Sequence, residues 1–196
     1  MKLKEIADIR TGLVLSRKKA ALSDDMKIKY RQVTLKSVSN STSLILDCID
    51  DFISSEEIDN TYMSREGDVV VRLREPVTAV YIDKSSKGMV VPSFMSIVRV
   101  NNDMVDNEFL AYYINSITAQ RMLEKVMKFA TIFSLKTKDL EDLDIVLPSL
   151  EEQKKVVALM KTSEEEIQLL DKLKKQKEQL AQAILDTIIQ SNKDNK

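Results

Sequence analysis

The chain contains no histidine, no tryptophan and a single cysteine among its 196 residues. Without histidine the commonest general base is missing, and neither a Ser-His nor a Cys-His nucleophile pair can be assembled. Cys48 alone excludes an internal disulfide and a Cys/His zinc site, so we expect it to be a buried small apolar residue. The three glycines, Gly12, Gly67 and Gly88, are spaced too widely for a phosphate-binding loop. We therefore expect no catalytic centre, no metal and no cofactor.

Long apolar runs are also missing. No stretch of eighteen apolar residues occurs, and residues 1–10 alternate charged and apolar side chains where a signal peptide has an apolar core. We expect a soluble, cytoplasmic protein with no membrane contact.

The net charge of −1 is the sum of segments of opposite sign. Residues 1–40 carry ten Lys and Arg against four Asp and Glu, residues 41–70 one against eight, and residues 71–100 five against two. Such an alternation allows a basic face on a nearly neutral chain. The alternative, that these charges are ordinary solvated surface charges, stays open at this point.

Residues 30–100 are rich in β-branched side chains in short runs, which predicts strands. The expected strands are 31–38, 43–46, 68–73, 77–82 and 94–100. The run Val69-Val70-Val71 predicts a strand covered on both faces, entered from a turn at Gly67. The segment 85–88 predicts the turn of a hairpin between residues 81–82 and 90–91, with Pro92 at an edge or a bulge.

Helical spacing replaces this pattern after residue 103. Apolar residues from Phe109 to Val126 recur at steps of three and four, and Asn107 is placed to cap that helix. A short helical turn at 138–143 and a strand-like segment at 144–147 follow. Pro148 ends that segment, and Ser149 can cap what comes next.

Residues 150–190 contain neither Gly nor Pro and carry one long apolar stripe. A helix of about forty residues is roughly 60 Å long, which is more than a domain of this size can cover, so we expect a coiled coil with a second helix. Ser163, Lys174 and Lys177 interrupt the stripe and can set register and partner choice. The alternative is a helix folded back onto its own domain. The expected dimerisation residues are Val156, Leu159, Met160, Ile167, Leu170, Leu173, Leu180, Ile184 and Ile188.

The order of these pieces resembles the specificity subunit of type I restriction-modification enzymes. The resemblance rests on residues 3–9 with Gly12, on 30–35, 67–70, 109–114 and 140–145, and most specifically on Leu147-Pro148-Ser149-Leu150-Glu151-Glu152-Gln153 at the start of the long helix. It covers almost the whole chain. One departure lies at residues 128–133, where family members often have a glycine.

The resemblance implies an α+β fold: a β-rich mixed target recognition domain at 1–147 and a helical spacer at 148–190 that forms a coiled coil. Residues 191–196, at the end of the chain, are expected to be a disordered tail. Family subunits usually carry two recognition domains and two spacers, whereas this chain carries one of each. We therefore expect a half-subunit that pairs with a second copy through antiparallel helices and reads a symmetric, bipartite DNA target. The implied partners are double-stranded DNA, the adenine methyltransferase subunit and the restriction subunit, which perform the chemistry.

The candidate DNA-binding residues divide into two groups. Phosphate contacts are expected from Arg17, Lys18, Lys19, Lys27, Lys29 and Lys36. Base contacts are expected from Arg31, Gln32, Arg72 and Arg74, because an Arg fork reads guanine and Gln reads adenine. An ordinary ion pair with Glu75 or Asp83 is an equal alternative for Arg72 and Arg74. Ser86, Lys87 and Thr131 are weaker candidates on loops.

Two further hypotheses from other classes compete with DNA recognition. A coiled-coil adaptor that binds only protein fits the nearly neutral charge and the few aromatic residues. One basic patch shared by residues 17–36 and 72–87 would favour the DNA reader, and separation of these stretches would favour the adaptor. A stand-alone enzyme would need a catalytic centre without His or a Cys cluster, and the sequence offers no candidate for one.

Overall fold

The structure is a computed structural model that describes residues 1–21, 23, 26–39, 42–128 and 134–194. It divides into two compact units, Met1–Lys154 and Lys155–Lys196. The first unit contains all the named strands and the second contains most of the C-terminal helix. Within the described ranges no helix combines the length and the apolarity that a membrane crossing requires.

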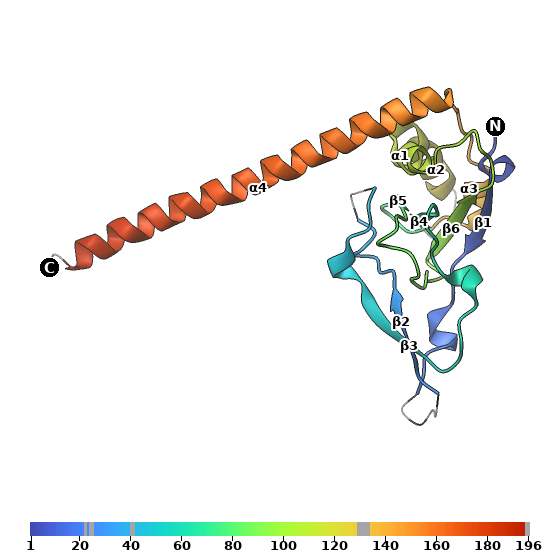
Figure 1. Ribbon diagram of the computed structural model, residues 1–196, viewed down its shortest axis with the longest axis horizontal. Coiled ribbons are helices and arrows are strands. Elements are labelled where there is room, and N and C mark those ends of the chain that lie inside the picture. The colour runs from blue at the N-terminus through green and yellow to red at the C-terminus, as the bar shows by residue number, and fades with distance from the viewer. Residues whose placement is uncertain (22, 24–25, 40–41, 129–133, 195–196) are drawn as a thin grey trace. The chain divides into compact units, whose positions relative to one another are not determined.

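Two antiparallel sheets form the framework of the first unit (Figure 1). The main sheet has the strand order β1-β6-β4-β5, and a separate hairpin pairs β2 with β3. The strand bounds are β1 Ala7–Thr11, β2 Ile28–Gln32, β3 Asp50–Ser54, β4 Val69–Arg72, β5 Thr78–Tyr81 and β6 Met95–Val100. Short 3-10 helices lie at Leu3–Glu5, Leu15–Arg17, Leu46–Cys48 and Asn60–Tyr62.

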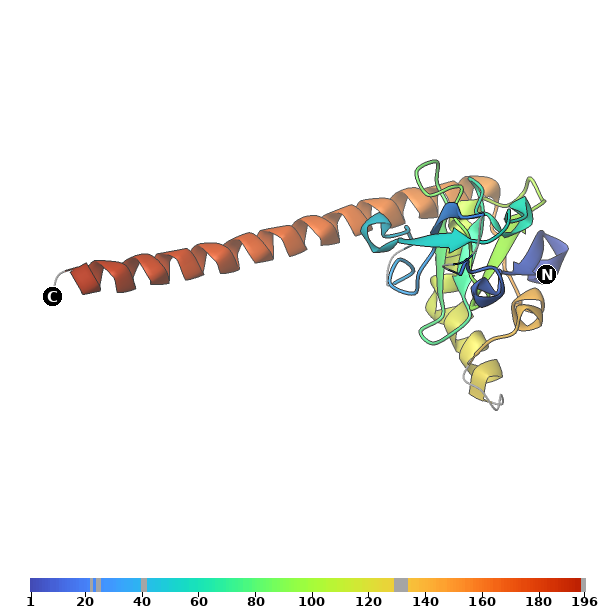
Figure 2. The same cartoon turned by 90° about the horizontal axis from the view of Figure 1, so that it is seen from below.

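The main sheet is covered on both faces, as the valine run predicts. Val69 and Val71 face one apolar cluster, which includes Leu110, Ile114 and residues of the following helices. Val70, between them, faces a second cluster with Val33 and other residues, because neighbouring side chains of a strand point to opposite faces. Figures 1 and 2 show helices α1 and α2 on one side of this sheet and the β2–β3 hairpin on the other.

Helices α1 Asn107–Asn115, α2 Ile117–Lys128 and α3 Thr137–Glu141 cover the first cluster. The cap of α1 is Asp106, whose carboxylate accepts from the backbone N–H groups of Glu108 and Phe109 at 3.0 Å each. The prediction of Asn107 as the cap is therefore wrong: its amide instead donates to the Gly67 carbonyl at 2.7 Å. The single long helix expected here is also broken, at Ser116, where the backbone is extended.

Several strand predictions need correction. The expected strand 31–38 ends at Gln32, because Thr34 and Ser37 exchange side-chain to backbone hydrogen bonds that close a turn. The expected strand 43–46 is replaced by an isolated bridge from Ser43 to Tyr81 and by a 3-10 helix that begins at Leu46. The segment 144–147 is likewise represented by a single bridge, from Asp144 to Lys2. Strands β1 and β3 are not predicted by the sequence pattern, and the other expected strands are confirmed within two residues.

At two positions the backbone requires glycine. Gly67 has φ +91°, which confirms the turn that leads into β4. At Gly12 a Cβ atom would lie 2.3 Å from the carbonyl oxygen of Pro92, so only glycine allows the two backbones to approach this closely. The neighbouring Leu13 donates to the Val91 carbonyl at 2.8 Å, which joins the two segments.

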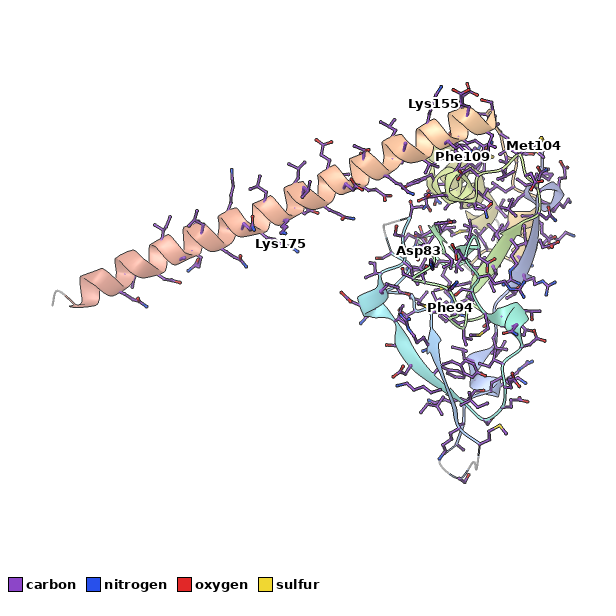
Figure 3. The ribbon with its side chains drawn as sticks, viewed as in Figure 1. Asp83, Phe94, Met104, Phe109, Lys155 and Lys175 are labelled. Atoms are coloured by element: carbon purple, nitrogen blue, oxygen red, sulfur yellow. The ribbon has the colours of Figure 1, made fainter. Side chains whose placement is uncertain are left out.

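The predicted hairpin between residues 81–82 and 90–91 is wrong, although its turn exists. Ile82 exchanges backbone hydrogen bonds of 2.8 Å with the Gly67–Asp68 turn, whereas Val90 pairs with Arg31 and Val33. The turn itself is organised by Asp83, labelled in Figure 3, whose carboxylate accepts hydrogen bonds from Ser85 and Ser86. Burial pushes the pKa of Asp83 up, but hydrogen bonds from Ser86 and Ser85 outweigh this effect and hold the pKa below its ordinary value.

Helix α4 runs from Leu150 to Asp194, four residues beyond the end expected at 190. Its start is a capping box, because the Ser149 N–H donates to the Glu152 carboxylate at 2.9 Å and the Glu152 N–H donates back to the Ser149 hydroxyl at 3.4 Å. Hydrogen bonds from the Ser149 hydroxyl and N–H lower the pKa of Glu152. The α+β fold with a long C-terminal helix is confirmed.

Candidate nucleic-acid interface

The β2–β3 hairpin presents one charged face. Tyr30 and Phe52 lie opposite each other in the register and belong to a third apolar cluster, which anchors the hairpin. Lys29 and Arg31 alternate with Tyr30 and are therefore exposed on the other face. Asp51 lies opposite Arg31, and its carboxylate is 2.7 Å from the ammonium of Lys29.

Two hollows flank the end of β2 and share Leu15 and Gln32 in their linings. The first has a volume of about 730 Å³ and includes Lys19 and Lys27, and the second has about 500 Å³ and includes Lys36. The buried side-chain oxygen of Gln32, Oε1, has no hydrogen-bond partner among the described residues. An amide at the meeting point of two hollows is placed to contact a ligand that occupies either one.

The basic candidate residues differ in whether their side chains form ion pairs. Lys18 pairs with Glu56 and Lys87 with Glu66 in exposed ion pairs. Exposed pairs of this kind contribute at most about 1 kcal/mol, so a phosphate can compete for either lysine. In the described part of the chain, no side-chain partner is found for five other exposed candidates, namely Arg17, Lys19, Arg31, Lys36 and Arg74.

Arg72 and Arg74 do not lie on the same strand. Strand β4 ends at Arg72, and Arg74 forms an isolated bridge with Ser134. The guanidinium of Arg72 donates to the backbone carbonyl of Glu75 at 2.9 Å, and its buried Nε has no partner in the described ranges. Neither arginine forms a described ion pair with Glu75 or Asp83. Arg72 is thus half-buried and partly engaged, whereas Arg74 is exposed.

The second basic stretch is divided between two ends of the sheet. Arg72 lies opposite Thr78 and Val69 lies opposite Tyr81, so the loop after Tyr81 that carries Lys87 is at the end of the β4–β5 pair remote from Arg72. The joint patch of residues 17–36 and 72–87, which would favour the DNA reader over the adaptor, is therefore not continuous along this pair. The candidates around the hairpin form the more compact group. Thr131 lies outside the described residues, as does most of the departure at 128–133.

A buried ion pair between Asp68 and Arg99 ties the Gly67 turn to β6. The Arg99 guanidinium donates two hydrogen bonds, of 2.9 and 3.1 Å, to the Asp68 carboxylate and a third of 2.8 Å to the Met63 carbonyl. Only 3% of the Asp68 side chain is exposed. The pair is separated by 31 positions in the chain, so no local pattern reveals it.

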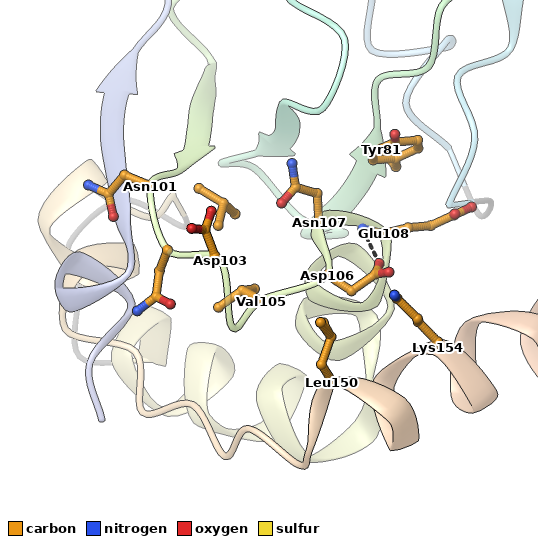
Figure 4. A pocket seen from close by; sticks show the side chains of 11 residues that line it. Tyr81, Asn101, Asp103, Val105, Asp106, Asn107, Glu108, Leu150 and Lys154 are labelled. Carbon is orange, nitrogen blue, oxygen red and sulfur yellow. Dashed lines mark hydrogen bonds between the residues drawn. The ribbon is translucent and has the colours of Figure 1, made fainter.

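The start of α4 is fastened to the first unit by one buried amide. Gln153 is fully buried; its Oε1 accepts from the Asp106 N–H at 2.8 Å, and its Nε2 donates to the Met104 and Pro148 carbonyls at 2.9 Å each. This bonding explains why Gln ends the Pro-x-Leu-Glu-Glu-Gln pattern. A polar hollow of about 620 Å³ beside it is lined by Asp106 and Lys154, among others (Figure 4).

The remaining site predictions have mixed outcomes. Cys48 is half-buried and unbonded to any cysteine, whereas full burial was expected. Within the described ranges, no group of three or more His, Cys, Asp or Glu side chains is arranged to hold a metal ion. Seven of the expected dimerisation side chains on α4 lie in the second unit with at least 38% of their surface exposed, namely Leu159, Met160, Ile167, Leu170, Leu173, Leu180 and Ile184. Val156 is 37% exposed, and the side chain of Ile188 is outside the described residues.

Comparison with known proteins is consistent with this arrangement. Residues 1–179 match the family described as the type I restriction modification DNA specificity domain. The chain is 29% identical over 122 residues to the putative type I restriction enzyme MjaX specificity subunit of Methanocaldococcus jannaschii, which covers 62% of this chain and 28% of that protein.

Two solved structures share the fold. The HsdS subunit from Thermoanaerobacter tengcongensis has a TM-score of 0.64 at 16% identity, and a chain from a study of assembly and conformational transition of the type I R-M system has 0.67 at 17%. Each match covers 88% of this chain and 43% of the other, so the chain spans less than half the length of these relatives. The comparisons do not favour a protein-only adaptor. With its family model matching nearly the whole chain, the protein belongs to the type I restriction-modification DNA specificity family.

Proposed function

We propose that this chain is a non-catalytic DNA specificity subunit that directs a type I methyltransferase, and a restriction subunit, to a bipartite target. Residues 1–147 act as the target recognition domain and 148–190 as the spacer. The observation that carries the proposal is the meeting of two hollows at Gln32, with Lys19, Lys27 and Lys36 in their linings. Membership of the specificity family supports it. The complex works in the cytoplasm, where its DNA is.

Each group of side chains has its own role in this proposal. The lysines around the hollows, together with Arg17 and Lys29, contact phosphates and supply affinity that falls as salt rises. Gln32 and Arg31 contact base edges, because the Gln amide can donate and accept at once and therefore matches adenine. The position of Gln32 in the linings of both hollows supports this role. Arg72 is a weaker base reader than Arg74, since its guanidinium already donates to Glu75.

Two copies associate through α4 in the proposed subunit. The exposed apolar side chains of its second-unit segment recur along one stripe, and a self-complementary contact between two copies buries such a stripe on both. Antiparallel pairing places a recognition domain at each end, which gives a target of two inverted halves. The methyltransferase subunit docks on this assembly and supplies the chemistry.

The test is to express the chain with a type I adenine methyltransferase subunit from the same source and to map methylated adenines in the host DNA. We expect methylation at one two-part motif that is symmetric about its spacer. A complex that forms without new methylation would contradict the DNA-reading role. Absence of any complex would contradict the proposed partnership with the methyltransferase.

Variants then separate phosphate contacts from base contacts. Lys19→Ala and Lys36→Ala should each weaken binding to every sequence and flatten the log K against log salt slope by about 0.9 per lost phosphate contact. Gln32→Ala should instead change the methylated motif at one position in each half. Lys4→Ala is the matched control, because Lys4 pairs with Asp142 rather than lining either hollow. Unchanged affinity and motif in both Arg72→Ala and Arg74→Ala would remove these arginines from the interface.

A further inference from the structure

The charged residues within the apolar stripe of α4 have opposite signs. The centre of the stripe follows positions at alternating steps of three and four, namely Val156, Leu159, Ser163, Glu166, Leu170, Leu173, Lys177, Leu180 and Ile184, while Met160, Ile167 and Lys174 lie along its edge. Its six apolar side chains are between 37% and 68% exposed. Glu166 and Lys177 are exposed on the same stripe and have no side-chain partner among the described residues. Any helix that covers the stripe must therefore bury an acid and a base.

We propose that α4 pairs with α4 of a second copy in one antiparallel register, in which the two-fold axis passes between residues 171 and 172 and Glu166 of each copy meets Lys177 of the other. This inference rests on the self-association proposed above and specifies its geometry. In a two-fold contact, if residue i meets residue j, then j meets i, so one register forms the ion pair twice. The charges that interrupt the stripe then determine the register.

The same register matches the apolar positions of the stripe. Residues at equal distances from the axis on its two sides meet each other. Leu170 therefore lies opposite Leu173 of the partner and Leu159 opposite Ile184, and each contact occurs twice. Ser163 lies opposite Leu180, and in this register this layer pairs a polar side chain with an apolar one. Between residues 159 and 184 the seam is about 38 Å long and contains no unpaired charge.

Neighbouring registers lack this match. A shift of one heptad in one direction places Leu170 opposite Glu166 and Lys177 opposite Leu159. The opposite shift places Lys177 opposite Leu173 and Glu166 opposite Ile184. Both shifts bury single charges against apolar side chains, which is unfavourable.

A parallel pair is disfavoured by the same residues. Identical positions face each other in a parallel coiled coil, so Glu166 would meet Glu166 and Lys177 would meet Lys177 at the centre of the contact. Because both contacts are repulsive, the sign pattern selects the antiparallel arrangement. Lys175 (Figure 3) and Glu165 belong to the other side of the helix and take no part in this selection.

Charge reversal tests the pairing in the full-length chain. Glu166→Lys and Lys177→Glu should each weaken the dimer about tenfold or more, because each converts two attractions into two repulsions. The double variant should recover wild-type association, and the two single variants should prefer each other when mixed. Glu165→Lys and Lys175→Glu are matched controls that change the same charges outside the seam. Single variants as tight as these controls would overturn the register.

Spin-label distances test the register without weakening the dimer. In a Cys48→Ser background, Gln168→Cys and Gln182→Cys place labels on one outward face of α4, two heptads apart. The register predicts separations along the helix axis of about 10 Å for position 168 and about 32 Å for position 182. Equal distances at the two positions, as a parallel pair gives, would overturn the proposal while leaving self-association intact. A monomer in sedimentation at micromolar concentration would overturn the proposed self-association as well.

Discussion

Replacing Gln153 with alanine should destabilise the first unit more than any other single change at an amide side chain. The side chain is fully buried and makes three hydrogen bonds of 2.8 to 2.9 Å, with the Asp106 N–H and the Met104 and Pro148 carbonyls. At about 1 kcal/mol for each bond, and with backbone groups left unpaired in a buried place, we expect a loss of about 3 kcal/mol in the free energy of unfolding.

The assay is urea unfolding followed by tyrosine fluorescence, because the chain has no tryptophan and α4 contains no tyrosine that would mix its own melting into the signal. Hydrogen exchange at the Asp106 amide gives a local readout, and this proton should exchange faster in the variant. Gln168→Ala, on an exposed part of α4, is the matched control. A loss equal to that of the control, or an unchanged Asp106 amide, would refute the reasoning that Gln153 holds the start of α4 within the first unit.

Three further predictions concern the rest of the first unit. Arg99→Ala leaves the buried Asp68 carboxylate without its partner and should lower the free energy of unfolding, measured by thermal denaturation, by about 3 to 5 kcal/mol. Its control, Lys2→Ala, breaks an exposed pair and should change the free energy of unfolding by at most about 1 kcal/mol. Gly12→Ala adds a Cβ that would lie 2.3 Å from a backbone oxygen and should lower the melting temperature more than Gly88→Ala, where nothing lies within 4 Å of the added atom. Asp83 has a lowered pKa, so its stabilising contribution is present above its unfolded pKa and is lost as pH falls through the folded pKa; Ser86→Ala, which removes one of its donors, should make the loss of stability in acid shallower, and an unchanged acid profile would contradict that role.

The strands that the sequence predicts are those whose side chains are apolar on both faces. Val69 to Val71 can satisfy two clusters at once, so the pattern is visible without knowing the neighbours. Strand β3 is different, because it begins with Asp50 and Asp51 and buries only Phe52 and Ser54. Its strand character comes from pairing with β2, a tertiary contact that local preference does not encode.

Local polar bonds account for the other differences. The Thr34–Ser37 turn replaces a strand because hydroxyl groups compete with the sheet for backbone partners. Ser116 ends α1, and its hydroxyl accepts from the Ala119 N–H at 3.3 Å to begin α2, so a continuous apolar spacing is divided between two helices. Gln153 was included in the pattern behind the resemblance, but its three partners lie in segments that only the fold brings together.

The sequence predicts which charged residues are candidates for DNA contact, but it does not predict which of them lie together on the surface. Lys19, Lys27 and Lys36 are within one basic stretch of the sequence, and the structure brings all three to the two hollows at Gln32. Arg72 and Lys87 belong to a second stretch that the β4–β5 pair divides. Which charges meet therefore depends on strand register, which composition does not contain.

The separate anchoring of the β2–β3 hairpin has an evolutionary consequence. Tyr30 and Phe52 hold it through a small third cluster, whereas Lys29 and Arg31 on its other face belong to none of the three clusters. Substitutions on that outward face leave the packing beneath it unchanged. They are therefore selected for their effect on binding and hardly for their effect on folding. In the proposed function, new sequence preferences can thus arise by single substitutions on this face without a change in the framework.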